Sequence, residues 1–280
     1  MVELDQRSFQ SLPELTAGEY DAFCALIHAR SGIHLGTQKN TLLRSRLSKR
    51  LRALGLNSFG EYYDYLRRKD PMGSELKRML DAISTNLTEF FREDAHFEQL
   101  KQHFFERWKD APEIRILSAG CSSGEEPYSI AMCAREALGT NASRIKIEAG
   151  DLSTQALAQA QSGVYTLEKV KNISAERLRA FFLRGTGPNM GLVSVGKELR
   201  GMVRFQRVNL MEPLPYTAPF HAIFCRNVAI YFDRPTQQDL MEKLQTQLVP
   251  GGTLYLGHSE SLLHSPSTLT YVQPSVYEKK

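Results

Sequence analysis

The chain has 280 residues, of which 42% are hydrophobic, and its formal net charge is +4. This length allows two domains, the composition is that of a globular protein, and so small a charge does not by itself argue for nucleic-acid binding. No apolar run approaches the ~18 residues that span a membrane, and residues 1–13 lack the apolar core of a signal peptide. We therefore expect a cytoplasmic protein without membrane insertion.

The cysteines point in the same direction. There are four, and none forms a Cys-x-x-Cys pair: Cys24, Cys121, Cys133 and Cys225. This pattern indicates neither a zinc motif nor a disulfide framework, so we expect reduced thiols and no metal site.

From residue 18 to about residue 85 the pattern is helical, and strand signals are absent. Tyr20, Phe23 and Ile27 form one apolar stripe, and Gly32 follows as a C-terminal cap. We place an all-helical domain over residues 1–85. The second domain then covers residues 86–280.

A basic helix is predicted within this first domain, over residues 39–54. Its leucines fall on one face, at Leu43, Leu47, Leu51 and Leu54, and the basic residues lie on the other side, at Lys39, Arg46, Lys49, Arg50 and Arg52. A charged face is usually only solvated. Here almost no acidic residue interleaves, which favours an acidic partner. No aromatic residue interleaves either, so a surface for stacking nucleic-acid bases is not indicated.

After Pro112 the pattern alternates between strands and helices. The strand candidates are 114–118, 145–149, 203–208, 220–225 and 253–257, and the helices between them are about 125–138, 153–161 and 235–248. This alternation predicts an α/β fold with a doubly wound parallel sheet. Residues 92–109 are predicted to form a helix that joins the two regions. The glycine-rich segment at about 185–202 is predicted to be a small inserted hairpin unit.

A glycine-rich turn follows the first strand, with Gly120 and Gly124 before a helix that has Pro127 in its first turn. Such a turn lets the backbone approach a ligand closely and presents free N–H groups. It lacks the Gly-Lys-Ser/Thr of a P-loop, and Glu125 and Glu126 at the helix start disfavour a pyrophosphate. An acidic mouth suits a cationic ligand with hydroxyl groups. S-adenosylmethionine, with its sulfonium, ammonium and ribose diol, fits that description.

Polar residues follow the next two strands. Asp151 comes at the end of the second strand, where nucleotide-binding folds hold a ribose diol. The alternative is that Asp151 or Ser153 only caps the next helix, and the ribose role is favoured. Asn209 follows the third strand and could read an adenine edge or simply form a turn.

The fourth strand runs directly into Cys225, Arg226 and Asn227, with Tyr231 shortly after. Residues just past a strand's carboxyl end face the ligand crevice in open sheets, so Arg226, Asn227 and Tyr231 are site candidates. Cys225 is either plain core or a wall of the cofactor site.

The junction of the two regions carries a further polar group, with Asn86, Thr88 and Arg92 beside Phe90 and Phe91. A domain junction is a common place for a site, and the alternative is a helix cap with a core aromatic pair.

Together these segments resemble the CheR family of chemoreceptor methyltransferases, from about Tyr20 to Tyr277. The resemblance is carried by four motifs in order: Thr85-Asn86-Leu87-Thr88-Glu89-Phe90-Phe91-Arg92-Glu93, Ser122-Ser123-Gly124-Glu125-Glu126-Pro127-Tyr128-Ser129, Phe224-Cys225-Arg226-Asn227-Val228-Ala229-Ile230-Tyr231-Phe232 and Gly257-His258-Ser259-Glu260-Ser261. It implies a helical N-terminal domain and a Rossmann-like class I methyltransferase domain with a small inserted β-subdomain. The implied reaction is methyl ester formation on glutamate side chains of chemoreceptors, with S-adenosylmethionine as donor and S-adenosylhomocysteine as product.

The resemblance also implies roles for single residues. It implies cofactor contacts from Asn86, Thr88, Arg92, Glu126, Asp151, Asn209, Leu210, Cys225 and Arg226, to which we add Asn227. The acidic receptor helices would dock on Arg46, Lys49, Arg50 and Arg52. In some members of the family the β-subdomain holds a C-terminal receptor pentapeptide as an added strand, and the length of the segment here is similar to that type.

The expected mechanism needs no strong base, because a glutamate carboxylate is already ionised at neutral pH. Proximity and alignment then supply the catalysis. We expect Arg92 to orient the substrate carboxylate and Tyr231 to line the methyl channel.

Two alternatives remain at this point: a methyltransferase acting on another substrate, such as nucleic acid or a small molecule, and an S-adenosylmethionine-binding adaptor without activity. Nothing in the sequence demands more than a monomer. His258, Ser259 and Glu260 either lie near the site or only shape the turn after a strand.

Overall fold

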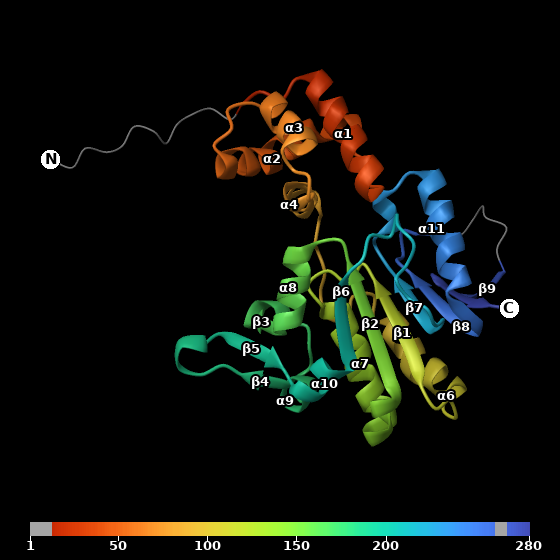
Figure 1. Cartoon of the computed structure of the whole chain (residues 1–280). Helices are drawn as coiled ribbons and strands as arrows, with labels where there is room; N and C mark the ends of the chain where they lie inside the picture. Colours follow the sequence, from red (N-terminus) through yellow and green to blue (C-terminus); the bar gives the residue numbers. More distant parts are fainter. Residues whose placement is uncertain (1–12, 261–267) are drawn as a thin grey trace. The chain divides into compact units, whose positions relative to one another are not determined.

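The computed structural model describes residues 13–260 and 268–280 (Figure 1). Most of the segment considered above for a signal peptide, and Ser261 of the last motif, lie outside these ranges. The chain forms two compact units, one that ends at Ser84 and one that begins at Thr85. Among the described residues, no helix combines the length and the apolar character needed to cross a membrane.

The first unit is helical, as its sequence pattern predicts. Its elements are α1 (Ala17–Ser31), the 3-10 turn η2 (Thr37–Lys39), α2 (Asn40–Leu54), α3 (Phe59–Arg68) and α4 (Ser74–Ile83). Gly32 ends α1 with a left-handed φ of 72°, so the predicted cap is confirmed. The core forms where the ring of Phe23 packs on Phe59 and Tyr62, with centroid separations of 6.4 and 5.9 Å.

Helix α2 is tied to α4 by a buried ion pair. The Arg50 guanidinium donates from Nε and Nη2 to the two oxygens of Glu75, at 2.8 and 2.7 Å. Tyr62 donates its hydroxyl to the same carboxylate at 2.9 Å, and the Glu75 side chain is only 4% exposed. Arg46 donates to the carbonyls of Ile83 and Ser84 at the end of α4. Two of the basic residues on α2 are therefore used inside the helical unit.

The second unit contains a seven-stranded sheet in the order β6-β2-β1-β7-β8-β10-β9. Its strands are β1 (Ile114–Ala119), β2 (Ile145–Asp151), β6 (Val203–Arg207), β7 (Phe220–Cys225), β8 (Leu248–Leu256), β9 (Leu269–Gln273) and β10 (Val276–Lys279). The strands from β6 through β8 are parallel, whereas β10 pairs antiparallel with β8 and β9. The predicted parallel strands are confirmed, and the antiparallel pair at the edge was not predicted.

Helices cover both faces of this sheet (Figure 1). Alternate strand residues point to opposite faces, and apolar side chains on both faces need a covering layer. Ile116 of β1 packs in the layer with Phe97 and Leu100, while its neighbour Leu117 packs in the layer with Leu244. The helices and turns of the unit are α5 (Ala95–Gln99), the π-helical turn η3 (Leu100–Phe104), α6 (Phe105–Arg107), α7 (Glu125–Leu138), η4 (Gly139–Arg144), α8 (Thr154–Ser162), η5 (Leu167–Val170), α9 (Ala175–Phe181), η6 (Gly187–Asn189), α10 (Lys197–Met202), η7 (Ala229–Tyr231) and α11 (Arg234–Thr246). The doubly wound arrangement is therefore confirmed.

The helix predicted over residues 92–109 is shorter and irregular. It begins at Ala95, because Phe91 and Glu93 have positive φ values of 55° and 57° that a helix cannot accommodate. A π-helical turn, Leu100–Phe104, then separates α5 from α6. π-helical turns are rare and often lie near functional sites.

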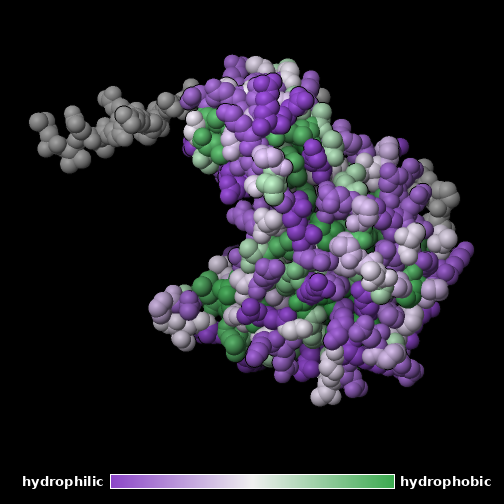
Figure 2. All heavy atoms as spheres, in the orientation of Figure 1, coloured by the Kyte–Doolittle hydropathy of each residue, from purple (hydrophilic) through white to green (hydrophobic). Residues whose placement is uncertain are grey.

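A small antiparallel sheet is inserted between α8 and β6, in the order β3-β5-β4. It consists of β3 (Val164–Thr166), β4 (Phe182–Arg184) and β5 (Leu192–Val195), so it draws on a longer stretch than the predicted 185–202, and residues 197–202 form α10 instead. Two strands of three residues each are too short to give a periodic signal. Figure 2 shows hydrophobic atoms on this projecting sheet; Leu183 of β4 is 67% exposed, and Met190, in the loop before β5, is 78% exposed.

The Arg50–Glu75 pair leads to a stability prediction. Arg50→Met should destabilise the protein by about 3 kcal/mol, because it leaves the buried Glu75 carboxylate with only a longer ion pair, to Arg78 at 3.8 Å. Lys49→Met is the matched control: the neighbouring Lys49 is exposed, and the change should stay within about 0.5 kcal/mol. Urea unfolding followed by circular dichroism measures both, and equal midpoints for the two variants would contradict this role of the ion pair.

Candidate active site

The candidate site lies at the carboxyl edge of the parallel strands. Strands β6, β2, β1 and β7 are neighbours in the sheet, so the segments that follow them meet at one edge. The backbone N–H groups of Gly120 and Cys121 both donate to the carbonyl of Gly150, at 2.8 and 2.9 Å. The N–H of Val208 donates to the carbonyl of Asp151 at 2.9 Å. The sequence segments that carried the predicted site are therefore adjacent.

The glycine-rich turn requires glycine at both positions. Gly120 has a φ of 86°, and a Cβ there would lie 2.3 Å from Cγ2 of Val228. Gly124 has a φ of 97° at the start of α7, and its Cβ would lie 2.8 Å from Cβ of Ala160. A side chain at either position would both strain the backbone and displace a neighbour.

Asp151 joins two loops through its carboxylate. It accepts hydrogen bonds from the backbone N–H groups of Ser122 and Ser153, at 2.7 and 2.8 Å. The helix cap of α8 is the hydroxyl of Ser153, which accepts from Ala156 N–H at 3.2 Å. Of the two readings, the capping role thus belongs to Ser153. The Asp151 carboxylate is oriented by the loops that would surround a cofactor.

Asn209 forms the turn after β6. Its side-chain oxygen accepts from the N–H of Met211 at 3.1 Å, and its side-chain nitrogen donates to Glu212 at 3.0 Å. This is the turn geometry that the sequence offered as the alternative. The neighbouring Leu210 is half-buried, and its carbonyl accepts from Nζ of Lys243 at 2.7 Å.

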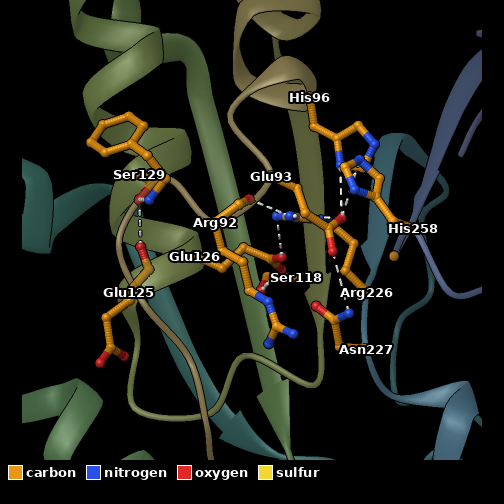
Figure 3. A network of polar contacts seen from close by, with 12 residues as sticks. Arg92, Glu93, His96, Ser118, Glu125, Glu126, Ser129, Arg226, Asn227 and His258 are labelled. Carbon is orange, nitrogen blue, oxygen red and sulfur yellow. Dashed lines mark hydrogen bonds and ion pairs between the residues drawn. The ribbon is translucent and has the colours of Figure 1, made fainter. Parts of the chain in front are cut away.

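Arg226 is the centre of a buried polar cluster (Figure 3). Its guanidinium forms ion pairs with Glu126 and Glu93, each at 3.1 Å, and donates to the backbone carbonyl of Arg92. The Arg226 side chain is only 2% exposed. This contact set joins the end of β7, the start of α7 and the segment before α5 around one cation.

The two carboxylates of this cluster differ in their electrostatics. Burial raises the pKa of Glu126, although Arg226 and the hydroxyl of Ser118, which donates at 2.7 Å, oppose the shift. Burial also acts to raise the pKa of Glu93, but the charge of Arg226 and the amide of Asn227 outweigh it and lower the pKa. Arg226 thus favours the ionised form of both carboxylates, and its effect outweighs that of burial only at Glu93.

The segment before α5 lies against the same loops. Asn86 donates its side-chain amide to the hydroxyl of Ser153 at 3.5 Å, and the carbonyl of Thr88 accepts from Lys169 at 3.3 Å. Arg92 donates to the carbonyl of Leu87 at 3.1 Å, and Figure 3 shows its guanidinium pointing away from that of Arg226.

The residues after β7 take different positions. Cys225 is fully buried in the layer under α11, and burial raises the pKa of its thiol well above the usual value. Asn227 is half-buried and donates its side-chain amide to Glu93 at 3.4 Å. Tyr231 is half-buried at the end of η7.

Glu93 and His96 belong to the site, although no role for them was predicted from the sequence. His96 is buried, which lowers its pKa to about 4 and keeps the ring neutral. Glu93, His96 and His258 place possible ligand atoms within 4.8 Å of one another. A metal ion does not fit this set, because the guanidinium of Arg226 already occupies the Glu93 carboxylate. The spacing of Glu93 and His96, three residues apart, was the sequence signal that could have pointed to these two residues.

Comparison with known proteins defines the class. The family model described as CheR methyltransferase, SAM binding domain, matches residues 86–277, and the model described as CheR methyltransferase, all-alpha domain, matches residues 18–84. The chain is 44% identical to the chemotaxis protein methyltransferase of Salmonella typhimurium over 248 residues, 88% of this chain and 85% of the relative. It is 42% identical to that of Escherichia coli over 265 residues, covering 94% and 91%. Chemotaxis protein methyltransferase 2 of Pseudomonas aeruginosa is 43% identical over 252 residues, covering 90% and 89%.

The α/β unit and these matches define an S-adenosylmethionine-dependent methyltransferase. Within that class, the chain belongs to the CheR family of chemotaxis methyltransferases.

The glycine geometry predicts a binding defect. Gly120→Ala should weaken S-adenosylhomocysteine binding about tenfold or more, because its Cβ would push Val228 and distort the turn. Gly201→Ala is the control, since a Cβ at Gly201 in α10 meets nothing within 4 Å. Isothermal titration of both variants measures the effect, and unchanged affinity in Gly120→Ala would show that the turn does not contribute to the cofactor site.

Proposed function

We propose that this protein transfers the methyl group of S-adenosylmethionine to glutamate side chains of chemoreceptors, which gives methyl esters for sensory adaptation. The observation that carries the proposal is that both units match chemotaxis methyltransferases, the helical one over residues 18–84 as well as the α/β one. A methyltransferase unit alone would not indicate the substrate. Because chemoreceptor methylation regions lie in the cytoplasm, the proposal places the enzyme there.

The cofactor would be held by the polar edge described above. The proposed contacts are Asn86, Thr88, Arg92, Glu126, Asp151, Asn209, Leu210, Cys225, Arg226 and Asn227. Asp151 supports this assignment best, because its fixed carboxylate can accept from two ribose hydroxyls. The pairing of Arg226 with two carboxylates also matters, since an unpaired guanidinium would repel a sulfonium.

The cofactor supplies an electrophilic methyl group, and the protein's own residues align the acceptor. A glutamate carboxylate is ionised at neutral pH and needs no base. We assign Arg92 to orient this carboxylate, because a guanidinium keeps donors beyond the one used for Leu87. Tyr231 lines the path of the methyl group. The contact from Arg92 must be modest, because a tight ion pair would stabilise the anion and slow its attack.

The receptor helices would dock on the basic face of α2. The residues predicted for this docking are Arg46, Lys49, Arg50 and Arg52, and they differ in their contacts within the helical unit. Arg46 and Arg50 hold α4, whereas Lys49 and Arg52 are exposed. Exposed cations steer acidic partners, so Lys49 and Arg52 carry the larger share of the proposed docking.

The small sheet offers a second proposed contact with the receptor. Strands β3 and β4 are its edges, and a C-terminal receptor pentapeptide would add there as a further strand. The exposed Leu183 on β4 supports this, because an apolar side chain beside an open edge gives a peptide side chain a surface to cover. Nothing in this proposal requires more than a monomer.

The test is transfer of labelled methyl from S-adenosylmethionine to a purified chemoreceptor cytoplasmic fragment. We expect base-labile label, as for a glutamate methyl ester, that disappears when the receptor glutamates are replaced by alanine. Label that persists in the alanine receptor would indicate another substrate. Cofactor binding without any transfer would indicate the adaptor function instead.

The same assay tests Arg92. Arg92→Ala should lower kcat about 100-fold while leaving the unfolding midpoint near wild type, because the side chain aligns substrate and contributes one hydrogen bond to the fold. Arg204→Ala is the control, since that arginine on β6 is 75% exposed and the change removes the same charge. Full activity in Arg92→Ala would exclude the orienting role.

A further inference from the structure

Glu260 has an unusual set of partners for a glutamate in a loop. Its carboxylate, almost fully buried, accepts hydrogen bonds from four backbone N–H groups. One oxygen accepts from Gly257 and Asn227, at 2.7 and 2.8 Å, and the other accepts from Val228 and Ile230, at 2.9 and 3.2 Å. Four bonds fill the acceptor sites of a carboxylate, so Glu260 has no oxygen left to act on a substrate.

Three of these donors belong to the segment that follows β7 and carries the proposed site residues. Arg226 precedes the donors and Tyr231 follows them. Asn227 has a φ of 57°, which is costly for a residue other than glycine. The segment therefore needs an external group to keep its shape, and its own backbone bonds are few.

Gly257 allows this contact to form. A Cβ at Gly257 would lie 2.8 Å from the Glu260 carboxylate and 2.9 Å from the nitrogen of Asn227. The sheet does not depend on the contact, because β7 and β8 pair through their own backbones up to Cys225 and Leu256. Glu260 thus acts on the segment beyond the strand rather than on the strand itself.

We propose that Glu260 is a positioning residue for methyl transfer: its carboxylate fixes the backbone of residues 227–230, so that Arg226 stays between Glu93 and Glu126 and Tyr231 stays at the end of η7. This inference rests on the roles proposed for Arg226 and Tyr231. It assigns a task to the motif Gly257-His258-Ser259-Glu260, whose place in the molecule the sequence left open.

The test is Glu260→Gln, which keeps the shape of the side chain but replaces one acceptor oxygen by a donor. We expect kcat for methyl transfer, measured at saturating S-adenosylmethionine, to fall about tenfold or more, so that a weaker cofactor contact from Arg226 or Asn227 does not by itself account for the loss. Glu136→Gln is the matched control: that carboxylate also accepts two hydrogen bonds, from Arg177, but lies in the last turn of α7.

Amide hydrogen exchange separates positioning from general stability. In Glu260→Gln, exchange should rise in peptides covering 226–231, while protection of β7 and β8 stays at the wild-type level. Two outcomes would overturn the proposal. One is a fall in protection across the whole sheet that accounts for the lost activity, and the other is a wild-type kcat despite altered local exchange. If the glutamine variant does not fold, Glu260→Asp takes its place. Its shorter carboxylate should give the same local rise in exchange over residues 226–231 and a kcat below that of the wild type. An unchanged kcat in Glu260→Asp would again overturn the proposal. Because exchange needs no receptor, a failure of the proposed receptor substrate would be recognised separately, by absent transfer in the wild type.

Discussion

The site depends on the ion pairs that the buried guanidinium of Arg226 forms with Glu93 and Glu126. A charge this deeply buried is stable only when it is paired and hydrogen-bonded, and the loss of one partner is costly. Arg226 obtains its partners from segments far apart in the chain, since Glu93 precedes α5 and Glu126 lies in the first turn of α7. The need to satisfy this cation therefore fixes where those segments meet the end of β7.

Local patterns were enough to predict the parallel sheet and the turn after its first strand. The apolar run of β1 and the glycines at 120 and 124 are signals carried by neighbouring residues. The inserted β unit was predicted, but β3 and β4 lie outside its predicted range, because each has only three residues. The edge strands β9 and β10, of five and four residues, were not predicted. Their pairing is decided by contacts with distant strands, which no local pattern records.

The partners of the site residues likewise depend on distant parts of the chain, so local sequence patterns did not predict them. A basic face on α2 was readable from spacing, but the assignment of Arg50 to the face or to the core depends on Glu75, in another helix. Asp151 and Asn209 were each left with two interpretations because a side chain's partner is a property of the fold. The structure gives Asn209 the turn geometry and gives the helix cap to Ser153 rather than Asp151.

Backbone strain is concentrated at this edge of the sheet. Of the residues other than glycine that have positive φ in the described ranges, Phe91, Glu93, Ser122 and Asn227 lie in the segments that form the site. Each is held by an interaction from elsewhere in the unit, such as Asp151 for Ser122 and Glu260 for Asn227. Strain of this kind persists only where surrounding contacts over-determine it. The proposed reaction on a glutamate carboxylate needs no base, so it would gain most from alignment, which a site built from rigidly held loops can supply.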